Sequence, residues 1–351
     1  MTLKHFLFSA LMLLSAGTAW ADVEINETNF PDASFRNYLL SQDYGSDGKL
    51  TDEEIAGVTS INVSGTYFSP GTISSLKGIE FFTALEDLRC SDNQLNSLDV
   101  SGCTALTTLF CYNNQLTSLD VSKNTALTWL QCDNNQLTSL DVSKNTALEI
   151  LWCYNNQLTS LDLSKNTALT RLHCYSNQLT SLDVSGCTAL TELWCYSNQL
   201  TSLDISGCTA LTELRCYDNQ LTSLDVSKNT VLTRLYCYQN RIKGAAMDAL
   251  VASLPTVSNY TMRVVYYENE QNVMTTTQVT AAKAKGWIPR YYDGDTWVEY
   301  AGVDPSTEVN NVEAADADDS APWYTINGVE LAEKPTAPGI YIHGGKKVVV
   351  K

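Results

Sequence analysis

The sequence predicts a solenoid, in which similar short units of chain stack as successive coils. Cysteines recur every 21 residues from Cys90 to Cys237. Each lies in the pattern Leu-x-x-Leu-x-Cys-x-x-Asn-x-Leu, as in residues 106–116. A fixed period of this length, with regularly placed leucines and a recurring asparagine, is typical of repeats that stack on one another instead of enclosing a single core.

Each repeat consists of two similar halves, for example residues 106–114 and residues 116–124. Both halves carry apolar residues at their positions 1, 4 and 6, and the last two of these point to the same face, as the alternation of a strand requires. We therefore expect residues 58–242 to form a mainly β solenoid, with a strand on both sides of each coil.

This pattern resembles the 21-residue, nested-duplication class of bacterial leucine-rich repeats, a relative of the internalin-type repeats. It departs from that pattern at three corners, where Gly-Cys replaces Lys-Asn, and at Val231 and Ile242. The resemblance implies a leucine-rich repeat solenoid that takes part in adhesion or in binding host proteins.

A solenoid has open ends, so both ends need caps. Residues 22–57 are expected to form a short α-helical N-terminal cap, with a helix from Pro31 to Gln42 and a helical turn from Asp52. Residues 243–301 predict a small α/β C-terminal cap. We expect this cap to hold a helix with Met247, Leu250, Val251 and Leu254 on one face, a strand from Met262 to Tyr267, a helix from Thr276 to Lys285 and strands to about Tyr300.

The first 21 residues have the features of a secretory signal peptide. Lys4 supplies the positive charge, residues 6–14 form a short apolar segment, and small residues precede a cleavage site before Asp22. No later segment approaches the ~20 apolar residues that a membrane-spanning helix needs. These features predict an exported protein.

The C-terminal region is expected to contain an acidic linker at residues 302–321 and a β-type tail at residues 322–351. The tail alternates like two or three strands with glycine turns. It resembles the C-terminal tails that some Gram-negative bacteria use as a signal for type IX secretion, which implies an extracellular or outer-surface location. The alternative is a small hairpin module without a sorting role.

The formal net charge of −17 disfavours nucleic acid and anionic membrane partners. The eight cysteines of the repeat column are interpreted as buried free thiols. Neighbouring coils lie about 4.8 Å apart, whereas disulfides prefer a Cβ separation of about 3.8 Å. Three further cysteines replace the corner asparagine of other repeats, and two of these, Cys187 and Cys208, lie in consecutive coils where a disulfide remains an alternative.

A loop in the N-terminal cap resembles an EF-hand and could bind one Ca²⁺. The candidate ligands are Asp43, Asp47, Lys49 through its carbonyl oxygen, Thr51 and Glu54. Gly48 stands at the sharp turn of the motif, but Gly45 occupies a position where the EF-hand has Asp or Asn. The alternative is an acidic loop that caps the helix beginning at Asp52.

Two polar columns of the repeat are interpreted as structural. The asparagine at position 9 is expected to bond turn backbone in its own and the adjacent coil, because a buried amide without partners costs about 1–3 kcal/mol. The aspartate column from Asp99 to Asp225 suggests a ladder of cation ligands, or else polar residues that bond the turn. We favour the second interpretation.

The candidate binding surface is the outward side of the first half-repeat, at positions 3, 5 and 7. These positions carry varied aromatic and charged residues, whereas the second half repeats Thr-Ser-x-Asp-x-Ser almost unchanged. One alternative is that stacked rings only brace the sheet. The candidate residues are Phe110, Tyr112, Trp129, Trp152, Tyr154, His173, Tyr175, Trp194, Tyr196, Arg215, Tyr217, Tyr236 and Tyr238.

Catalysis is not expected, because His173 and His343 are the only histidines after the predicted signal peptide and neither lies in a catalytic motif. The predicted function is a secreted or cell-surface module that binds a protein partner through its aromatic face. The first alternative is a glycan-binding protein, in which Trp152 and Trp194 stack on sugar rings. The second is a purely structural scaffold.

Overall fold

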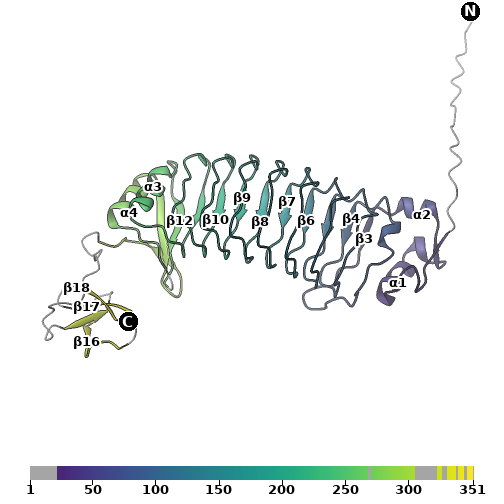
Figure 1. Ribbon diagram of the computed structural model, residues 1–351, viewed down its shortest axis with the longest axis horizontal. Helices are drawn as coiled ribbons and strands as arrows, with labels where there is room; N and C mark the ends of the chain where they lie inside the picture. Colours follow the sequence, from purple (N-terminus) through teal and green to yellow (C-terminus); the bar gives the residue numbers. More distant parts are fainter. Residues whose placement is uncertain are drawn as a thin grey trace, which may run out of the picture.

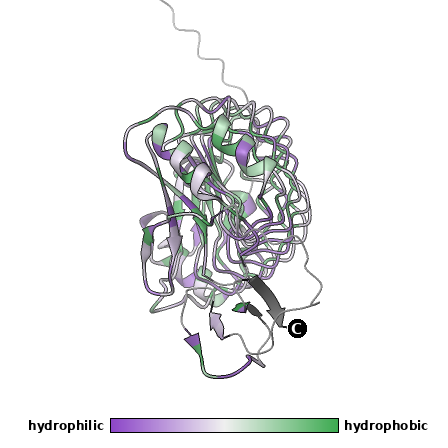
Figure 2. Ribbon diagram, turned by 90° about the vertical axis from the view of Figure 1, so that its left-hand side faces the viewer, coloured by the Kyte–Doolittle hydropathy of each residue, from purple (hydrophilic) through white to green (hydrophobic). Residues whose placement is uncertain are grey.

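The structure is a computed structural model, shown in Figure 1. It describes residues 22–267, 270–304, 322–325, 330–336, 339–343 and 346–350. The predicted signal peptide and residues 305–321 of the predicted linker lie outside the described residues. Seen from the end, the coils lie behind one another along a common axis (Figure 2).

One sheet of 12 strands runs along the whole stack of coils. Its strands are parallel from β3 (Ser60–Asn62) to β13 (Trp287–Tyr292), and β14 (Trp297–Glu299) joins the edge antiparallel. The central strands are β4 (Asp87–Arg89), β5 (Thr108–Phe110), β6 (Trp129–Gln131), β7 (Ile150–Trp152), β8 (Arg171–His173), β9 (Glu192–Trp194), β10 (Glu213–Arg215) and β11 (Arg234–Tyr236). Residues one repeat apart pair directly, so the predicted leucine-rich repeat solenoid is confirmed.

The expected strand on the second side of each coil is wrong. Within the described coils this side shows only isolated bridges, such as Asp162 with Asp183. The cause lies in the local hydrogen bonds. The backbone N–H of Ser122 donates to the side chain of Asp120 (2.8 Å), and the N–H of Asn124 then closes a turn onto Val121 (3.0 Å). The chain therefore turns before a ladder of backbone hydrogen bonds between coils can extend. The aspartate side chains bond the backbone of the turn, in agreement with our interpretation of this column.

The position-9 asparagines join each coil to the preceding one. In Asn156, Nδ2 donates to the carbonyl oxygens of Cys153 (3.2 Å) and Tyr154 (3.3 Å), and to that of Cys132 one coil earlier (3.1 Å). Its Oδ1 accepts the N–H of Leu137 (2.9 Å). Equivalent bonds recur from Asn93 to Asn240, so the expected structural role of this column is confirmed.

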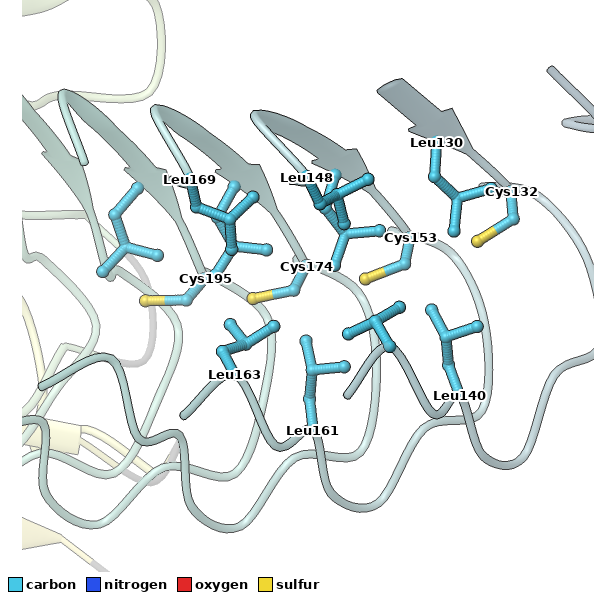
Figure 3. Packing of buried hydrophobic residues seen from close by; sticks show 14 of the residues in the cluster. Leu130, Cys132, Leu140, Leu148, Cys153, Leu161, Leu163, Leu169, Cys174 and Cys195 are labelled. Atoms are coloured by element: carbon cyan, nitrogen blue, oxygen red, sulfur yellow. The ribbon is translucent and has the colours of Figure 1, made fainter. Parts of the chain in front are cut away.

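The repeat-column cysteines form a ladder of free, fully buried thiols. Figure 3 shows Cys132, Cys153, Cys174 and Cys195 in one row, beside the leucines of the opposite half-repeat. Burial raises the pKa of these thiols, for example that of Cys90 to about 12. They therefore pack as small apolar side chains.

The corner cysteines are free as well. The thiol of Cys187 donates to the carbonyl oxygen of Asn166 (3.8 Å), and that of Cys208 donates to Val184 (3.4 Å). At the same corner in other coils an asparagine donates to such carbonyls, as Asn124 does to Val100 (2.9 Å). In this structure the thiol thus takes over the role of an amide, and Cys187 and Cys208 are not bonded to each other.

The N-terminal cap covers the first coil with aromatic side chains. Asp32 caps helix α1 by accepting the N–H of Phe35 (3.0 Å), and Phe30, Phe35 and Leu39 are fully buried. The helix is shorter than the predicted span from residue 31 to residue 42. The elements of this region are β1 (Val23–Glu24), α1 (Ala33–Leu40), η1 (Asp43–Gly45), β2 (Lys49–Leu50), α2 (Asp52–Gly57) and η2 (Ile79–Phe81).

The C-terminal α/β region continues the solenoid. Strand β12 (Tyr260–Val265) pairs in parallel with β11, and β13 pairs with β12, while α3 (Ala245–Ser253) and α4 (Thr276–Ala284) connect them. Asn272 reproduces the asparagine ladder, because its Nδ2 donates to Cys237 (2.8 Å) and its Oδ1 accepts from Ile242 (2.8 Å). This region therefore adds larger coils to the same sheet.

The described part of the tail forms a separate sheet of 4 antiparallel strands, in the order β16-β15-β17-β18. The sequence predicted two or three strands. The strands are β15 (Trp323–Thr325), β16 (Glu330–Leu331), β17 (Gly339–His343) and β18 (Lys346–Val350). No helix in the described part of the chain is long and apolar enough to span a bilayer.

The asparagine ladder can be tested with Asn156→Ala. This change leaves the Leu137 N–H without its partner, whereas the Cys132 carbonyl loses one bond and keeps the bond from Asn135. Because an unpaired buried group costs about 1–3 kcal/mol, we expect the free energy of unfolding to fall by about 1–3 kcal/mol in urea denaturation. The control is Gln157→Ala at the neighbouring exposed position, which should change it by less than about 0.5 kcal/mol. Equal effects of the two variants would refute the ladder's role.

Candidate functional site

The candidate residues of the aromatic face all lie on the outer surface of the sheet, because the leucine and cysteine that alternate with them point into the core. We call the outward side chains at positions 5 and 7 of coils β5 to β11, together with Trp129, the aromatic strip. Most of its members are half-buried, and Phe110, His173 and Tyr238 are nearly covered. The strip thus contains every predicted partner-binding residue.

Tyrosines at position 7 form a continuous stack. The rings of Tyr154, Tyr175, Tyr196, Tyr217 and Tyr238 follow one another with centroids 4.2–4.3 Å apart and planes within 10° of parallel. This spacing arises because parallel strands hold equivalent residues about 4.8 Å apart. Contacts of this kind contribute about 0.5–1.5 kcal/mol each, so the rings brace the sheet.

The hydroxyl groups of these tyrosines interact electrostatically along the column. Tyr217 interacts with both Tyr196 and Tyr238, and Tyr175 with both Tyr154 and Tyr196. At the N-terminal end of the column the Tyr154 hydroxyl interacts with Asp133. Burial raises the pKa of Tyr175 and Tyr217 well above the ordinary value, so the phenols stay neutral.

Position 5 forms a second column, in which rings and guanidinium groups alternate toward the C-terminal end. His173 lies between Trp152 (5.0 Å, 8° between planes) and Trp194 (3.9 Å, 5°). The guanidinium of Arg215 covers the other face of Trp194 at 3.8 Å and lies 5.2 Å from the ring of Tyr236. These contacts combine stacking with cation–π attraction.

This packing leaves Trp194 without a free ring face. A sugar that stacks on an indole needs such a face, and both faces of Trp194 are occupied by His173 and Arg215. Trp152 gives one face to His173 and contacts Trp129 edge-on at 6.3 Å. The sequence-based alternative of sugar stacking on these two tryptophans is therefore not favoured by the geometry.

Charged groups at position 3 are paired with neighbours on the strip. Glu192 accepts a hydrogen bond from His173 Nε2 (2.8 Å), and burial lowers the pKa of that imidazole although Glu192 opposes the effect. Glu213 accepts from Arg215 (2.6 Å) and Arg234 (2.9 Å). Burial alone would raise the pKa of Glu213, but the bonds to Arg234 and Arg215 lower it below its usual value.

The coil of β6 interrupts both aromatic columns. Gln131 stands at position 5 and Asp133 at position 7, and both side chains are buried, with Asp133 only 1% exposed. Asn134 donates to Oδ2 of Asp133 (2.8 Å), whereas Oδ1 has no hydrogen-bond partner among the described residues. Burial raises the pKa of Asp133 from 3.8 to about 6.

The strip also extends into a region that the sequence-based prediction missed. Tyr266 and Tyr292 continue the tyrosine stack (5.0 Å, 7°), and the guanidinium of Arg263 lies between the rings of Tyr236 (4.4 Å) and Trp297 (4.5 Å). In the structure Met262 pairs with Leu235, so it occupies the same position of the coil. The sequence does not show this equivalence, because the helical connection makes this repeat longer than 21 residues.

The residues next to the tyrosine column adopt left-handed backbone conformations. Asn113, Asn134, Asn155 and Ser176 have φ between 50° and 53°. Asparagine is one of the few residues that tolerate this conformation. Asn155 donates to Asn134 (2.8 Å) and Asn113 donates to Asp92 (2.7 Å), so these amides are already bonded to neighbouring side chains instead of standing free for a sugar.

The EF-hand-like loop uses two of its candidate ligands in a helix cap. Glu54 Oε2 accepts from the N–H (2.8 Å) and the hydroxyl (2.9 Å) of Thr51, which form a capping box for α2. Lys49 forms an ion pair with Asp22. Within the described residues no group of three His, Cys, Asp or Glu side chains is placed to hold a metal. Calcium binding by Asp43 and Asp47 stays a prediction, which calorimetric titration with CaCl₂ tests.

The comparisons with known proteins agree with this fold. A family model described as leucine-rich repeats in two copies matches residues 83–124 and 167–207. Comparison with curated protein sequences finds no match. The structure is similar to the functional domain of InlJ from Listeria monocytogenes, which includes a cysteine ladder. The identity is 28% and the TM-score 0.55, over 84% of this chain and 64% of that chain.

Two further solved structures share the fold. An internalin (InlF) from Listeria monocytogenes is 20% identical with a TM-score of 0.54, over 76% of this chain and 90% of that chain. The leucine-rich repeat protein LIC12759 of Leptospira interrogans is 22% identical with a TM-score of 0.51, over 60% of this chain and 55% of that chain. At these identities the likeness concerns the fold alone.

The buried carboxylate of Asp133 makes a specific prediction about stability. Because its pKa is higher in the folded than in the unfolded chain, the folded state loses stability as pH rises from about 4 to about 6. We expect Asp133→Asn to raise the free energy of unfolding near neutral pH by about 2–3 kcal/mol and to have little effect below about pH 4.

The control is Asp141→Asn, which removes an exposed carboxylate on the other side of the same coil. Urea denaturation of the three proteins across this pH range measures the effect. If wild type and Asp133→Asn respond to pH in the same way, the buried carboxylate does not titrate as inferred.

Proposed function

We propose that this leucine-rich repeat solenoid, whose fold is internalin-like, is an exported module that binds a protein partner through the aromatic strip. One observation carries the proposal. Varied rings and guanidinium groups are aligned on one outer face of the sheet over many coils, while the opposite side repeats the same small polar residues. Tyrosine, tryptophan and arginine are the residues that dominate the energetics of protein interfaces.

The stacking contacts between rings of the aromatic strip brace the sheet and also favour binding. Each stacked ring is already held in place, so little side-chain entropy remains to be lost when a partner docks. The ring edges and the exposed Arg171 and Arg234 stay available. A rigid surface that combines ring edges with exposed guanidinium groups suits protein recognition.

A protein partner suits this surface better than a glycan, because neighbouring side chains already stack on the planar faces of the rings. A protein surface can use ring edges, guanidinium groups and a broad continuous patch, none of which requires a free indole face. The paired charges at position 3 would set the orientation of the partner. Glycan-array binding that disappears in Trp194→Ala would instead support the glycan alternative.

Export is proposed from the predicted signal peptide and the tail. A Gram-negative outer-surface location by type IX secretion follows from the resemblance of residues 322–351 to sorting tails, and the described tail residues form a β-sheet. Recovery of the protein from culture medium with Asp22 as its first residue tests the cleavage. Retention of residues 1–21 in the exported protein would contradict it.

The binding face can be tested by reversing exposed charges at position 3, directly beside the aromatic strip. We expect the double variant Arg171→Glu and Arg234→Glu to weaken capture of the partner by about 30-fold or more, because exposed arginines beside stacked rings are typical energetic anchors. Binding of each variant to the partner captured by wild type is measured by surface plasmon resonance.

The matched control is the double variant Lys165→Glu and Lys228→Glu, which makes the same charge change at exposed corners. Its affinity should stay within about threefold of wild type. Equal loss in both double variants would attribute binding to overall charge and would exclude the strip as the docking face.

A further inference from the structure

Two arginines of the long sheet lack a carboxylate partner. Within the described residues, six arginines lie in strands of this sheet. Four of them pair with a carboxylate of the same or a neighbouring strand: Arg89 with Asp87 (3.0 Å), Arg171 with Glu192 (4.0 Å), Arg215 with Glu213 (2.6 Å) and Arg234 with Glu213 (2.9 Å). The other two, Arg263 and Arg290, form no ion pair with any described residue.

Arg263 and Arg290 stand side by side where the aromatic strip reaches the C-terminal region. Arg263 of β12 pairs in register with Arg290 of β13, so the two side chains leave the same face of the sheet about 4.8 Å apart. Their neighbours Met262 and Pro289 are buried, which places the arginines on the outer face. Two like charges this close repel each other, and an anion bound between them would remove the repulsion.

The guanidinium of Arg263 is held in place but keeps free donors. It lies between the rings of Tyr236 (4.4 Å) and Trp297 (4.5 Å). Its Nε is buried without an acceptor, whereas its two terminal nitrogens are accessible to solvent and make no hydrogen bond within the described residues. In Arg290, Nη1 donates to the carbonyl oxygen of Trp297 (3.1 Å), and the side chain is partly exposed. Both guanidinium groups can therefore be reached from outside.

Carboxylates in this part of the chain are bonded to other groups. Glu299 stands opposite Arg290 across β13 and β14, but it forms an ion pair with Lys283. Glu270 and Asp293 accept backbone N–H groups (2.8 Å each). The repulsion between the two arginines is thus not relieved by an ion pair with a described carboxylate.

The same surface contains a completed site of this kind. Glu213 accepts from both Arg215 and Arg234, which belong to neighbouring coils. The guanidinium of Arg215 also lies between two rings, those of Trp194 and Tyr236. One carboxylate therefore satisfies two arginines of adjacent coils beside stacked rings. The C-terminal end of the strip has the two guanidinium groups and the rings, but lacks the carboxylate.

We propose that Arg263 and Arg290, which we call the arginine pair, bind a carboxylate side chain of the protein partner. The proposal rests on the proposed function of the aromatic strip and specifies the chemistry of what its C-terminal end receives. The carboxylate accepts charge-assisted hydrogen bonds from both guanidinium groups, which are stronger than bonds between neutral groups. A single acidic side chain fits better than a polyanion, because the net charge of −17 repels an extended anionic partner.

The test uses two matched probes, acetyl-glutamate amide and acetyl-glutamine amide, with the full chain. Binding is followed by NMR through the indole N–H signal of Trp297, whose ring contacts Arg263. We expect wild type to bind the glutamate probe at least about tenfold more tightly than the glutamine probe. The double variant Arg263→Gln and Arg290→Gln should lose this preference. The matched control, Lys165→Gln and Lys228→Gln at exposed corners, should keep it.

A second variant lets the chain supply the carboxylate. Thr261 occupies position 3 of β12, as Glu213 does in β10. Thr261→Glu should therefore reproduce the pairing of Glu213 with Arg215 and block the glutamate probe, whereas Thr261→Gln should leave the preference unchanged. Glu268 lies outside the described residues, and Glu268→Gln is expected to leave the affinity for the glutamate probe unchanged.

Equal binding of the two probes to wild type, or an undiminished preference in the double arginine variant, would overturn the site. An about tenfold gain in glutamate affinity in Glu268→Gln would also overturn it, because the chain would then fill its own site. Inorganic phosphate is the third probe, and phosphate binding without a glutamate preference would exclude the carboxylate as the ligand. If partner capture still depends on Arg171 and Arg234 in these cases, the aromatic strip remains the docking face and only the carboxylate site fails.

Discussion

The structure depends on the hydrogen bonds that join each coil to the next in a strict register. Parallel pairing satisfies the backbone of the short strands, but each coil must also turn inward, and its turn carbonyls would be buried unpaired. The asparagine ladder removes that penalty, since one amide such as Asn156 bonds three carbonyls and one N–H across two coils. Every later feature follows from the resulting alignment of equivalent residues.

The alignment of equivalent residues in successive coils determines which side-chain groups the outer surface of the sheet presents. Rings at equivalent positions come to lie about one strand spacing apart, which is close to the distance at which aromatic rings stack. The tyrosines from Tyr154 to Tyr238 and the sandwich of His173 between two indoles result from this coincidence. Stacking makes the surface rigid and occupies the ring faces. Recognition is therefore left to ring edges, guanidinium groups and exposed charges.

In a surface built by repetition, departures from the repeat carry the most specific information. The uniform Thr-Ser-x-Asp-x-Ser side satisfies its own turns and contains no such departure at its aspartates. On the aromatic strip, Asp133 replaces a tyrosine and Gln131 replaces a ring, which leaves a buried carboxylate without a counter-ion. The strip thus combines a rigid, mostly neutralised surface with one unmatched acidic position.

The sequence by itself determined the solenoid, the inward leucines and cysteines, the structural asparagines and the outward aromatic positions, because a 21-residue period places equivalent residues in columns whatever their identity. It could not determine which ring faces remain free, because that depends on side-chain stacking between coils. The sequence also predicted strands on the second side, where side-chain bonds such as that of Asp120 turn the backbone instead. Only the tertiary structure showed that Asn272 and Tyr266 belong to the columns, because helical connections shift them out of the period. Likewise, the unpaired state of Asp133 is a property of its neighbours in space, which no spacing along the chain reveals.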